Sequence, residues 1–288
     1  MAIPPVPDLL EERLAALAEL PGVAESATAA REACTRLRFE EALRRRIPEA
    51  AGDSRIRGAQ ASAVLEGADV PLVRVRELVT GRQGWPDPPD PVDQVLRGVV
   101  QATAETEHVV GVVLRAPLQA MARLHVAATA ALLPAEQVGR PRQGHETARE
   151  LTDLGEPVPT GQVGERLAGI AALVTLIGRP RVPALLVMAL VHAEIASVRP
   201  FVRGNAVVAR AVDRALLQAS GLEPTGVAVP EVGHLRGGSA AYVGALAAYG
   251  TGSRAGVALW LRHCGDAVVA GAAEGERICA AVRSGRLA

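Results

Sequence analysis

The segment from Val182 to Val198 is apolar on nearly every side, and it constrains the fold of this 288-residue chain more than any other stretch. A helix with one apolar stripe packs on a surface, whereas a helix that is apolar all round lies inside a larger bundle. The longest apolar run within it, Val182 to Val191, is only about half of the roughly 20 residues that a membrane-spanning helix needs. We therefore expect a buried helix at the centre of an all-helical protein, and no membrane partner.

The composition agrees with close helix packing. Hydrophobic residues make up 49% of the chain but aromatic residues only 2%, so the core must be built from Ala, Val and Leu. Such side chains favour helices over an aromatic-rich sheet. The formal net charge is zero, and the chain therefore lacks the basic field that draws a protein to nucleic acid. We expect no nucleic-acid partner.

Three cysteines, Cys34, Cys264 and Cys279, lie far apart in the sequence. They have neither the even count of a disulfide framework nor the Cys/His spacing of a zinc site, so we expect no disulfide and no metal. The N-terminus, MAIPPVPDLLEERL, lacks the basic start and the apolar stretch of a signal peptide. These features favour a reducing, cytoplasmic location.

Helical periodicity continues on both sides of the central helix, with capping, glycine and proline signals at the helix ends. The other expected helices cover residues 9–17, 25–46, 53–66, 71–79, 91–106, 117–133, 160–176 (with Thr160 as the N-cap) and 205–220. The stretch GWPDPPDP, residues 84–91, cannot continue a helix and is expected to be a connector. The least regular part, residues 134–159, is long enough to hold a small hairpin or flap.

The junction RPFVRGNAVVAR, residues 199–210, has the features of an anion site. The central helix ends there in a short loop, and a new helix begins at Asn205. A helix N-terminus presents unpaired N–H groups and a partial positive charge, so it is a natural cradle for phosphate. Gly204 would let the backbone approach the anion closely. By itself, a Gly-Asn pair before a helix is a weak signal.

The longer segment HAEIASVRPFVRGNAVVAR resembles the signature of the Fic (Fido) family, H-x-F-x-[DE]-G-N-[GK]-R-x-x-R, which follows a long apolar helix. The positions that match in register are Phe201, Gly204, Asn205 and Arg210. The family's His, acidic residue, Gly and first Arg are replaced here by Arg199, Arg203, Ala206 and Val207. The resemblance therefore implies a Fic signature of which half is lost.

Two further matches lie upstream of the signature. Residues 62–67, SAVLEG, fit the inhibitory motif [ST]-x-x-x-E-[GN] that many Fic proteins carry on an N-terminal helix. In that family the motif Glu pairs with the last Arg of the signature and blocks placement of the γ-phosphate, so the expected inhibitory residues are Ser62, Glu66 and Gly67, with Arg210 as the partner. Leu124-His125 and GRPR, residues 139–142, resemble the L-H and G-x-x-R pattern ahead of the family's substrate-docking flap.

The resemblance implies an all-α, Fido-like helical bundle with a small β-hairpin flap and a helical N-terminal extension. We expect residues 1–108 to form that extension with the inhibitory-motif helix, residues 109–225 the Fido-like core, and residues 226–288 C-terminal helices packed on the core. Because family members often self-associate, a homo-oligomer is also expected. A protein partner would dock at the flap, residues 139–158.

In Fic enzymes the signature His is the general base and the acidic residue holds Mg²⁺. Arg199 cannot act as a base, since a guanidinium stays protonated and offers no acceptor, and Arg203 would repel the metal ion. Both arginines nevertheless suit phosphate. We therefore expect a catalytically inactive module that binds ATP or another nucleotide without Mg²⁺, or that binds a protein partner. The expected nucleotide- or phosphate-binding residues are Arg199, Phe201, Arg203, Gly204, Asn205 and Arg210.

Other interpretations stay open. The chain could be an active protein adenylyltransferase, or a related phosphate-group transferase, that uses a different base. Because the chain contains no Lys, Arg199 and Arg203 could also reflect drift in an Arg-rich genome. Glu66 could be an ordinary surface residue of a capped helix. The histidines at 125, 145 and 192 are expected to be structural or solvent-exposed, with His192 in the core.

Overall fold

The computed structural model describes residues 6–150 and 154–286, which form helices and loops but no strand. We call residues 199–204 the signature loop. The helices before this loop are α1 (Val6–Ala18), α2 (Val23–Arg38), α3 (Ile47–Leu65), α4 (Leu72–Val79), α5 (Pro91–Val113), α6 (Pro117–Thr129), α7 (Thr160–Val174) and α8 (Ala184–Val198). Those after it are α9 (Asn205–Ala219), α10 (Pro230–Leu235), α11 (Gly238–Gly250) and α12 (Arg254–Arg283), and the connections hold the short 3-10 helices η1 (Glu41–Arg44) and η2 (Ala135–Gln137). The expected all-α fold class is confirmed.

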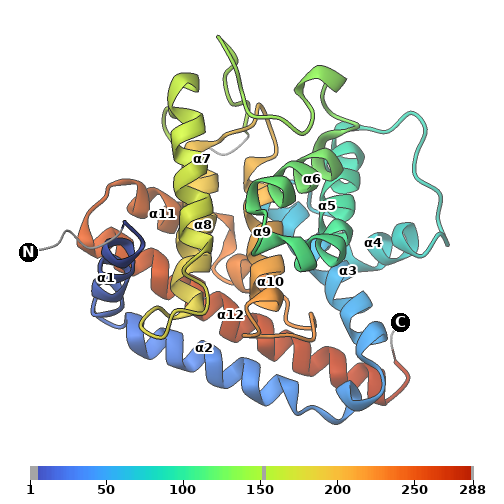
Figure 1. Ribbon diagram of the computed structural model, residues 1–288. Coiled ribbons are helices and arrows are strands. Elements are labelled where there is room, and N and C mark those ends of the chain that lie inside the picture. The colour runs from blue at the N-terminus through green and yellow to red at the C-terminus, as the bar shows by residue number, and fades with distance from the viewer. Residues whose placement is uncertain (1–5, 151–153, 287–288) are drawn as a thin grey trace, which may run out of the picture.

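Helix α8 lies at the centre of the molecule, as its apolar sequence requires. Helices α7, α9, α11 and α12 contact it, and the indole N–H of Trp260 donates to the carbonyl oxygen of Ala189 at 2.7 Å. Around this centre, α2 and α12 run side by side along the lower edge of Figure 1. One hydrophobic core extends from Leu14 to Val282. Within the described ranges, no helix has both the length and the apolar character needed to cross a membrane.

A second apolar cluster places the N-terminal helices against α9. It includes Ala63 of α3, Leu96 and Val99 of α5, and Val207 of α9. Burying an aliphatic side chain of Val or Leu size is worth roughly 1.5–3 kcal/mol. Because this cluster holds α3 along α9, the end of α3 that carries Ser62 comes next to the helix that follows the signature loop.

The irregular segment before α7 crosses the upper end of the molecule in Figure 1, where it lies over the signature loop. The β-hairpin expected in this flap, residues 139–158, is not seen among its described residues; residues 151–153 lie outside them. The flap backbone bonds to the signature loop instead, with Arg142 N–H donating to Pro200 O at 2.7 Å and Arg149 N–H to Val202 O at 2.6 Å. Amides used in this way cannot also pair two strands of a hairpin.

Several helix boundaries differ from those expected. The stretch expected as one helix over residues 25–46 is broken, because α2 ends at Arg38 and η1 follows. Helix α3 begins at Ile47 instead of Asp53, with a proline in its first turn. Thr160 does not cap α7: it is already helical, and its hydroxyl donates to the carbonyl oxygen of Gly144 at 2.7 Å. That contact ties the start of α7 to the flap.

Gly98 lets α5 and α6 pack closely. A Cβ atom at position 98 would lie 2.1 Å from the carbonyl oxygen of Ala128, which belongs to helix backbone and cannot easily shift. We predict that Gly98→Ala lowers the free energy of unfolding by about 1–3 kcal/mol. In the same helix, a Cβ at Gly111 meets nothing within 4 Å, so Gly111→Ala should be neutral or stabilising by up to about 1 kcal/mol. Urea unfolding followed by circular dichroism measures both, and equal effects would contradict this packing.

Candidate functional site

The signature loop joins α8 to α9 through two residues in the left-handed region. Arg199 ends α8 with φ 47°, and it is the one non-glycine residue of the described ranges with a positive φ. Gly204 precedes α9 with φ 81°. A Cβ atom at position 204 would also lie 2.9 Å from Cγ2 of Thr129. Position 204 therefore requires glycine both for its backbone angle and for its close approach to α6.

Asn205 closes the loop from the first turn of α9. Its Oδ1 accepts the N–H of Phe201 at 2.8 Å, and its Nδ2 donates to the carbonyl oxygen of Phe201 at 2.9 Å. The buried Phe201 ring stacks on the ring of His125, with centroids 4.0 Å apart and planes at 8°. These contacts hold the loop against α6 and α9.

His125 of α6 contacts the signature loop. Its Nδ1 accepts the N–H of Gly139 at 2.9 Å, so its Nε2 carries the proton and lies 3.1 Å from the carbonyl oxygen of Arg203, to which it donates. Burial lowers the pKa of His125 to about 4. The Leu-His and G-x-x-R segments thus meet beside the signature loop. With both ring nitrogens engaged, the neutral imidazole has no acceptor left for a substrate proton.

Arg210 joins α9 to the end of α3. Its Nη2 lies 2.6 Å from Oε1 of Glu66, and its Nε donates to Oγ of Ser62 at 2.8 Å. Burial by itself would lower the pKa of Arg210, but the charge of Glu66 and the nearby Tyr242 raise it. Glu66 follows the last turn of α3, where Gly67 adopts φ 80° and ends the helix. The structure therefore brings together both ends of the ion pair that the sequence predicted.

Two buried arginines bind the flap to the signature loop. Arg142 donates to the carbonyl oxygens of Arg199 at 2.7 Å, Val158 at 2.9 Å and Val198 at 3.3 Å. The side chain of Arg199 donates in turn to the carbonyl oxygen of Gly155. Burial and the neighbouring charge of Arg199 lower the pKa of Arg142. Arg199, at the general-base position of the signature, thus binds flap backbone in this structure.

A carboxylate from the flap occupies the N-terminus of α9. Oε1 of Glu150 accepts the backbone N–H of Asn205 at 2.8 Å and its side-chain Nδ2 at 2.5 Å. Burial and the charge of Glu66 raise the pKa of Glu150, while the donors from Asn205 and Gly204 act in the opposite direction. The free N–H groups of a helix N-terminus favour an anion, and here the chain supplies its own. Glu150 therefore fills the position that a phosphate would take.

Little space remains beside this carboxylate. A cavity of about 20 Å³ is lined in part by Glu66, Glu150, Arg203, Gly204 and Val207. That volume is enough for about one water molecule. Val207, which stands where the signature has its first Arg, is buried in the second apolar cluster. A nucleotide can enter only if the two carboxylates move.

Sequence reasoning did not identify Glu150 or a buried group formed by His192, Asp213 and His234. Glu150 lies in the irregular part of the chain, where no periodicity predicts the position of a side chain. The buried group comes from three different helices and has no local ligand spacing. His192 is fully buried, as expected, and His145 is exposed on the flap.

These features define the class of the protein: it is an all-helical bundle in which a buried helix ends in the signature loop, and an earlier helix places Glu66 on Arg210 of the helix that follows. Solved structures share the helical fold. A Fic family protein from Desulfovibrio desulfuricans G20 superposes with a TM-score of 0.69 at 18% identity, over 88% of this chain and 74% of that protein.

Two further structures are similar. A fragment of Fic-1 from C. elegans has a TM-score of 0.62 at 17% identity, covering 98% of this chain and 75% of its own. A Fic domain containing signaling protein from Bacteroides thetaiotaomicron VPI-5482 has a TM-score of 0.62 at 10% identity, and the match covers 88% of this chain and 98% of that protein. Neither a protein-family model nor a curated protein matches the sequence. The chain has the Fic (Fido) fold.

We predict that His125 makes folding sensitive to mild acid. Its pKa is about 4 in the folded protein and about 6.5 in the unfolded chain, so the unfolded state binds more protons between these values. Its contribution to stability is therefore complete above about pH 6.5 and is lost as the pH falls toward 4, amounting to about 3 kcal/mol in total. His125→Gln should lose less unfolding free energy between pH 7 and pH 5 than the wild type, as measured by urea denaturation. Parallel losses would disprove the assignment, because the other histidines contribute equally to both proteins.

Proposed function

We propose that this protein is a catalytically inactive Fic-fold module that binds nucleotide or phosphate at the signature loop without Mg²⁺. The observation that carries the proposal is the carboxylate of Glu150 at the N-terminus of α9. A helix end that accepts a carboxylate oxygen also suits a phosphate oxygen. In the bound state the phosphate would replace Glu150, with the half-buried Arg203 at the edge of the same cavity.

The residues around the loop support binding without transfer. Arg199 stays protonated and cannot take a proton from a target hydroxyl. His125 is engaged at both ring nitrogens. Arg203 stands where the Fic signature has the acid that holds Mg²⁺, and its charge would repel the ion. A nucleotide bound here would be retained and not transferred.

Glu66 and Glu150 would keep this module closed. Both line the small cavity, and the charge of Glu66 disfavours further negative charge there. When only a small fraction of the protein is open, the apparent affinity for nucleotide falls by that fraction. Since Glu150 belongs to the flap, a protein partner that binds residues 139–158 could open the site. We also propose that the protein is cytoplasmic and that it forms a homo-oligomer.

Removing both carboxylates should open the site. We predict that the double variant Glu66→Gly, Glu150→Ala binds ATP, ADP or AMP at least about tenfold more tightly than the wild type, or 1.4 kcal/mol. Isothermal titration with and without Mg²⁺ measures this, and Mg²⁺ should not strengthen binding. Glu156→Ala removes an exposed flap carboxylate and serves as the matched control, with wild-type affinity. If neither protein binds any of the three nucleotides under either condition, the proposal is wrong.

The alternative is an active adenylyl or phosphate-group transferase with a different base. The contact that favours it is the intact pair between Glu66 and Arg210 at 2.6 Å, because in Fic enzymes this pair restrains an activity. Such an enzyme would become more active when Glu66 is removed. The inactive module would not.

Incubation with labelled ATP separates the two functions. We predict no label transfer by the wild type or by Glu66→Gly; transfer by either would establish the enzyme. The double variant Glu66→Gly, Glu150→Ala that also carries Arg199→His, Arg203→Asp, Ala206→Gly and Val207→Arg should gain transfer, because these changes open the site and restore the base, the metal ligand and the phosphate clamp. A folded variant that still transfers nothing would contradict a Fic-like geometry of the loop.

A further inference from the structure

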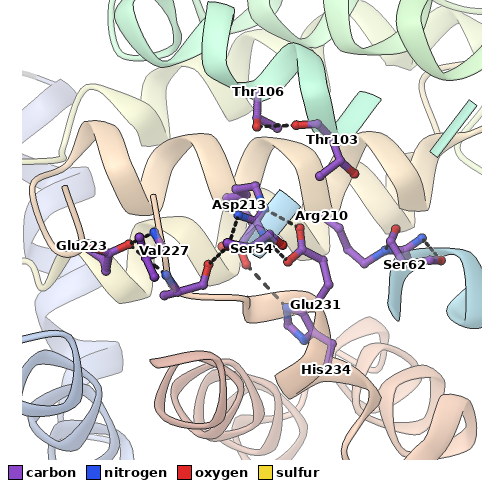
Figure 2. A network of polar contacts seen from close by, with 12 residues as sticks. Ser54, Ser62, Thr103, Thr106, Arg210, Asp213, Glu223, Val227, Glu231 and His234 are labelled. Carbon is purple, nitrogen blue, oxygen red and sulfur yellow. Dashed lines mark hydrogen bonds and ion pairs between the residues drawn. The ribbon is translucent and has the colours of Figure 1, made fainter. Parts of the chain in front are cut away.

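Three buried side chains meet in the interior, apart from the signature loop. They are His192 on α8, Asp213 on α9 and His234 on α10, with exposed fractions of 0%, 6% and 1%. Nε2 of His234 lies 3.5 Å from Oδ2 of Asp213, and Nδ1 of His192 lies 3.8 Å from the same oxygen. When one possible metal-ligand atom is taken from each residue, the three atoms lie within 4.8 Å of one another. Figure 2 shows His234 directed from α10 toward Asp213 on α9.

The spacing of these atoms suits one small cation. Zn²⁺ binds imidazole nitrogen and carboxylate oxygen at about 2.0–2.2 Å in a tetrahedron, which puts neighbouring donor atoms about 3.3 Å apart. The separations of 3.5 and 3.8 Å need only small side-chain shifts to reach this geometry. Both separations are, in contrast, long for direct hydrogen bonds. A set of two imidazoles and one carboxylate also favours Zn²⁺ over Mg²⁺ or Ca²⁺, which prefer oxygen ligands.

The outer nitrogen of each imidazole already has a partner. Nε2 of His192 lies 2.8 Å from the hydroxyl of Tyr242, and Nδ1 of His234 lies 3.2 Å from Nε2 of His263. Metal-bound histidines in proteins are oriented in this way, with the second nitrogen hydrogen-bonded so that the first faces the ion. Here the inner nitrogens of both rings face Asp213.

The buried carboxylate of Asp213 has no Arg among its ion-pair partners in the described residues. The ion-pair partners of Asp213 among the described residues are His192 at 3.8 Å and His234 at 3.5 Å. The guanidinium of Arg210 is paired with Glu66 instead. A buried carboxylate without a cation is costly. In addition, Nδ1 of His192 has no hydrogen-bond partner in the described part of the chain.

We propose that His192, Asp213 and His234 bind one Zn²⁺ ion, with a water molecule as the fourth ligand. The ion would neutralise the carboxylate, satisfy the orphaned imidazole nitrogen and cross-link α8, α9 and α10. Because the site is closed to substrates, the ion is structural. The proposal departs from the absence of metal expected from the cysteines, and it does not depend on nucleotide binding, since the ligands are separate from the loop.

The test begins with the full chain unfolded in chelator and refolded without metal, with Zn²⁺ or with Co²⁺, because a buried ion enters during folding. We expect one equivalent of Zn²⁺ per chain after desalting, a higher Tm than that of the metal-free protein, and the visible absorption bands of tetrahedral Co²⁺. Asp213→Asn and His234→Gln should weaken Zn²⁺ binding by more than about 100-fold, and loss of the outer partner in His263→Gln by about 10–100-fold. His125→Gln removes a different buried histidine and should bind Zn²⁺ as the wild type does.

Wild-type protein that folds without retaining Zn²⁺, or equal retention by Asp213→Asn and His234→Gln, would overturn the proposal. If the variants or the chelated chain do not refold, wild-type protein expressed with Zn²⁺ and never unfolded is analysed by X-ray absorption at the zinc edge. Two imidazoles with oxygen ligands support the site. Bound sulfur, fewer than two imidazoles or the absence of zinc rules it out.

Discussion

The buried charge of Arg210 organises the centre of this molecule. A guanidinium that is 1% exposed needs a partner, and removing the partner of such a buried pair costs about 3–5 kcal/mol. Glu66 and Ser62 supply the contacts, so the end of α3 must lie against α9. The apolar cluster between α3, α5 and α9 supports the same arrangement. As a consequence, the carboxylate of Glu66, which comes from a distant part of the chain, lies beside the signature loop.

The signature loop is closed by contacts with its own chain. Arg199 binds the flap at Gly155, and Val207 packs in an apolar cluster. The flap in turn brings Glu150 onto the helix end at Asn205. Because the free amides of a helix N-terminus need an acceptor, the chain satisfies them internally when no phosphate is bound. The residues that differ from the Fic signature and the carboxylate at the N-terminus of α9 therefore belong to one site.

A row of buried polar groups connects this site to the histidine group in the interior. Cζ of Arg210 lies 5.7 Å from the ring centroid of Tyr242, whose hydroxyl lies 2.8 Å from His192. The charge of Arg210 contributes to lowering the pKa of both His192 and His234. Any movement of Arg210 on release of Glu66 would therefore change the field at these histidines. The ion pair beside the loop and the histidine group in the interior are therefore neighbours, although they share no residue.

The sequence by itself determined the all-helical class and the central position of residues 182–198, because a helix that is apolar on every side is stable only inside a bundle. The resemblance of two motifs to those of the Fic family also implied the contact between Glu66 and Arg210, without knowledge of the packing. The residue type at position 199 was enough to exclude a general base there. Only the tertiary structure decided that the flap pairs with the signature loop, that Glu150 fills the helix end, and that His192, Asp213 and His234 converge. These contacts join segments far apart in the chain, and no local periodicity or spacing encodes how such segments pack.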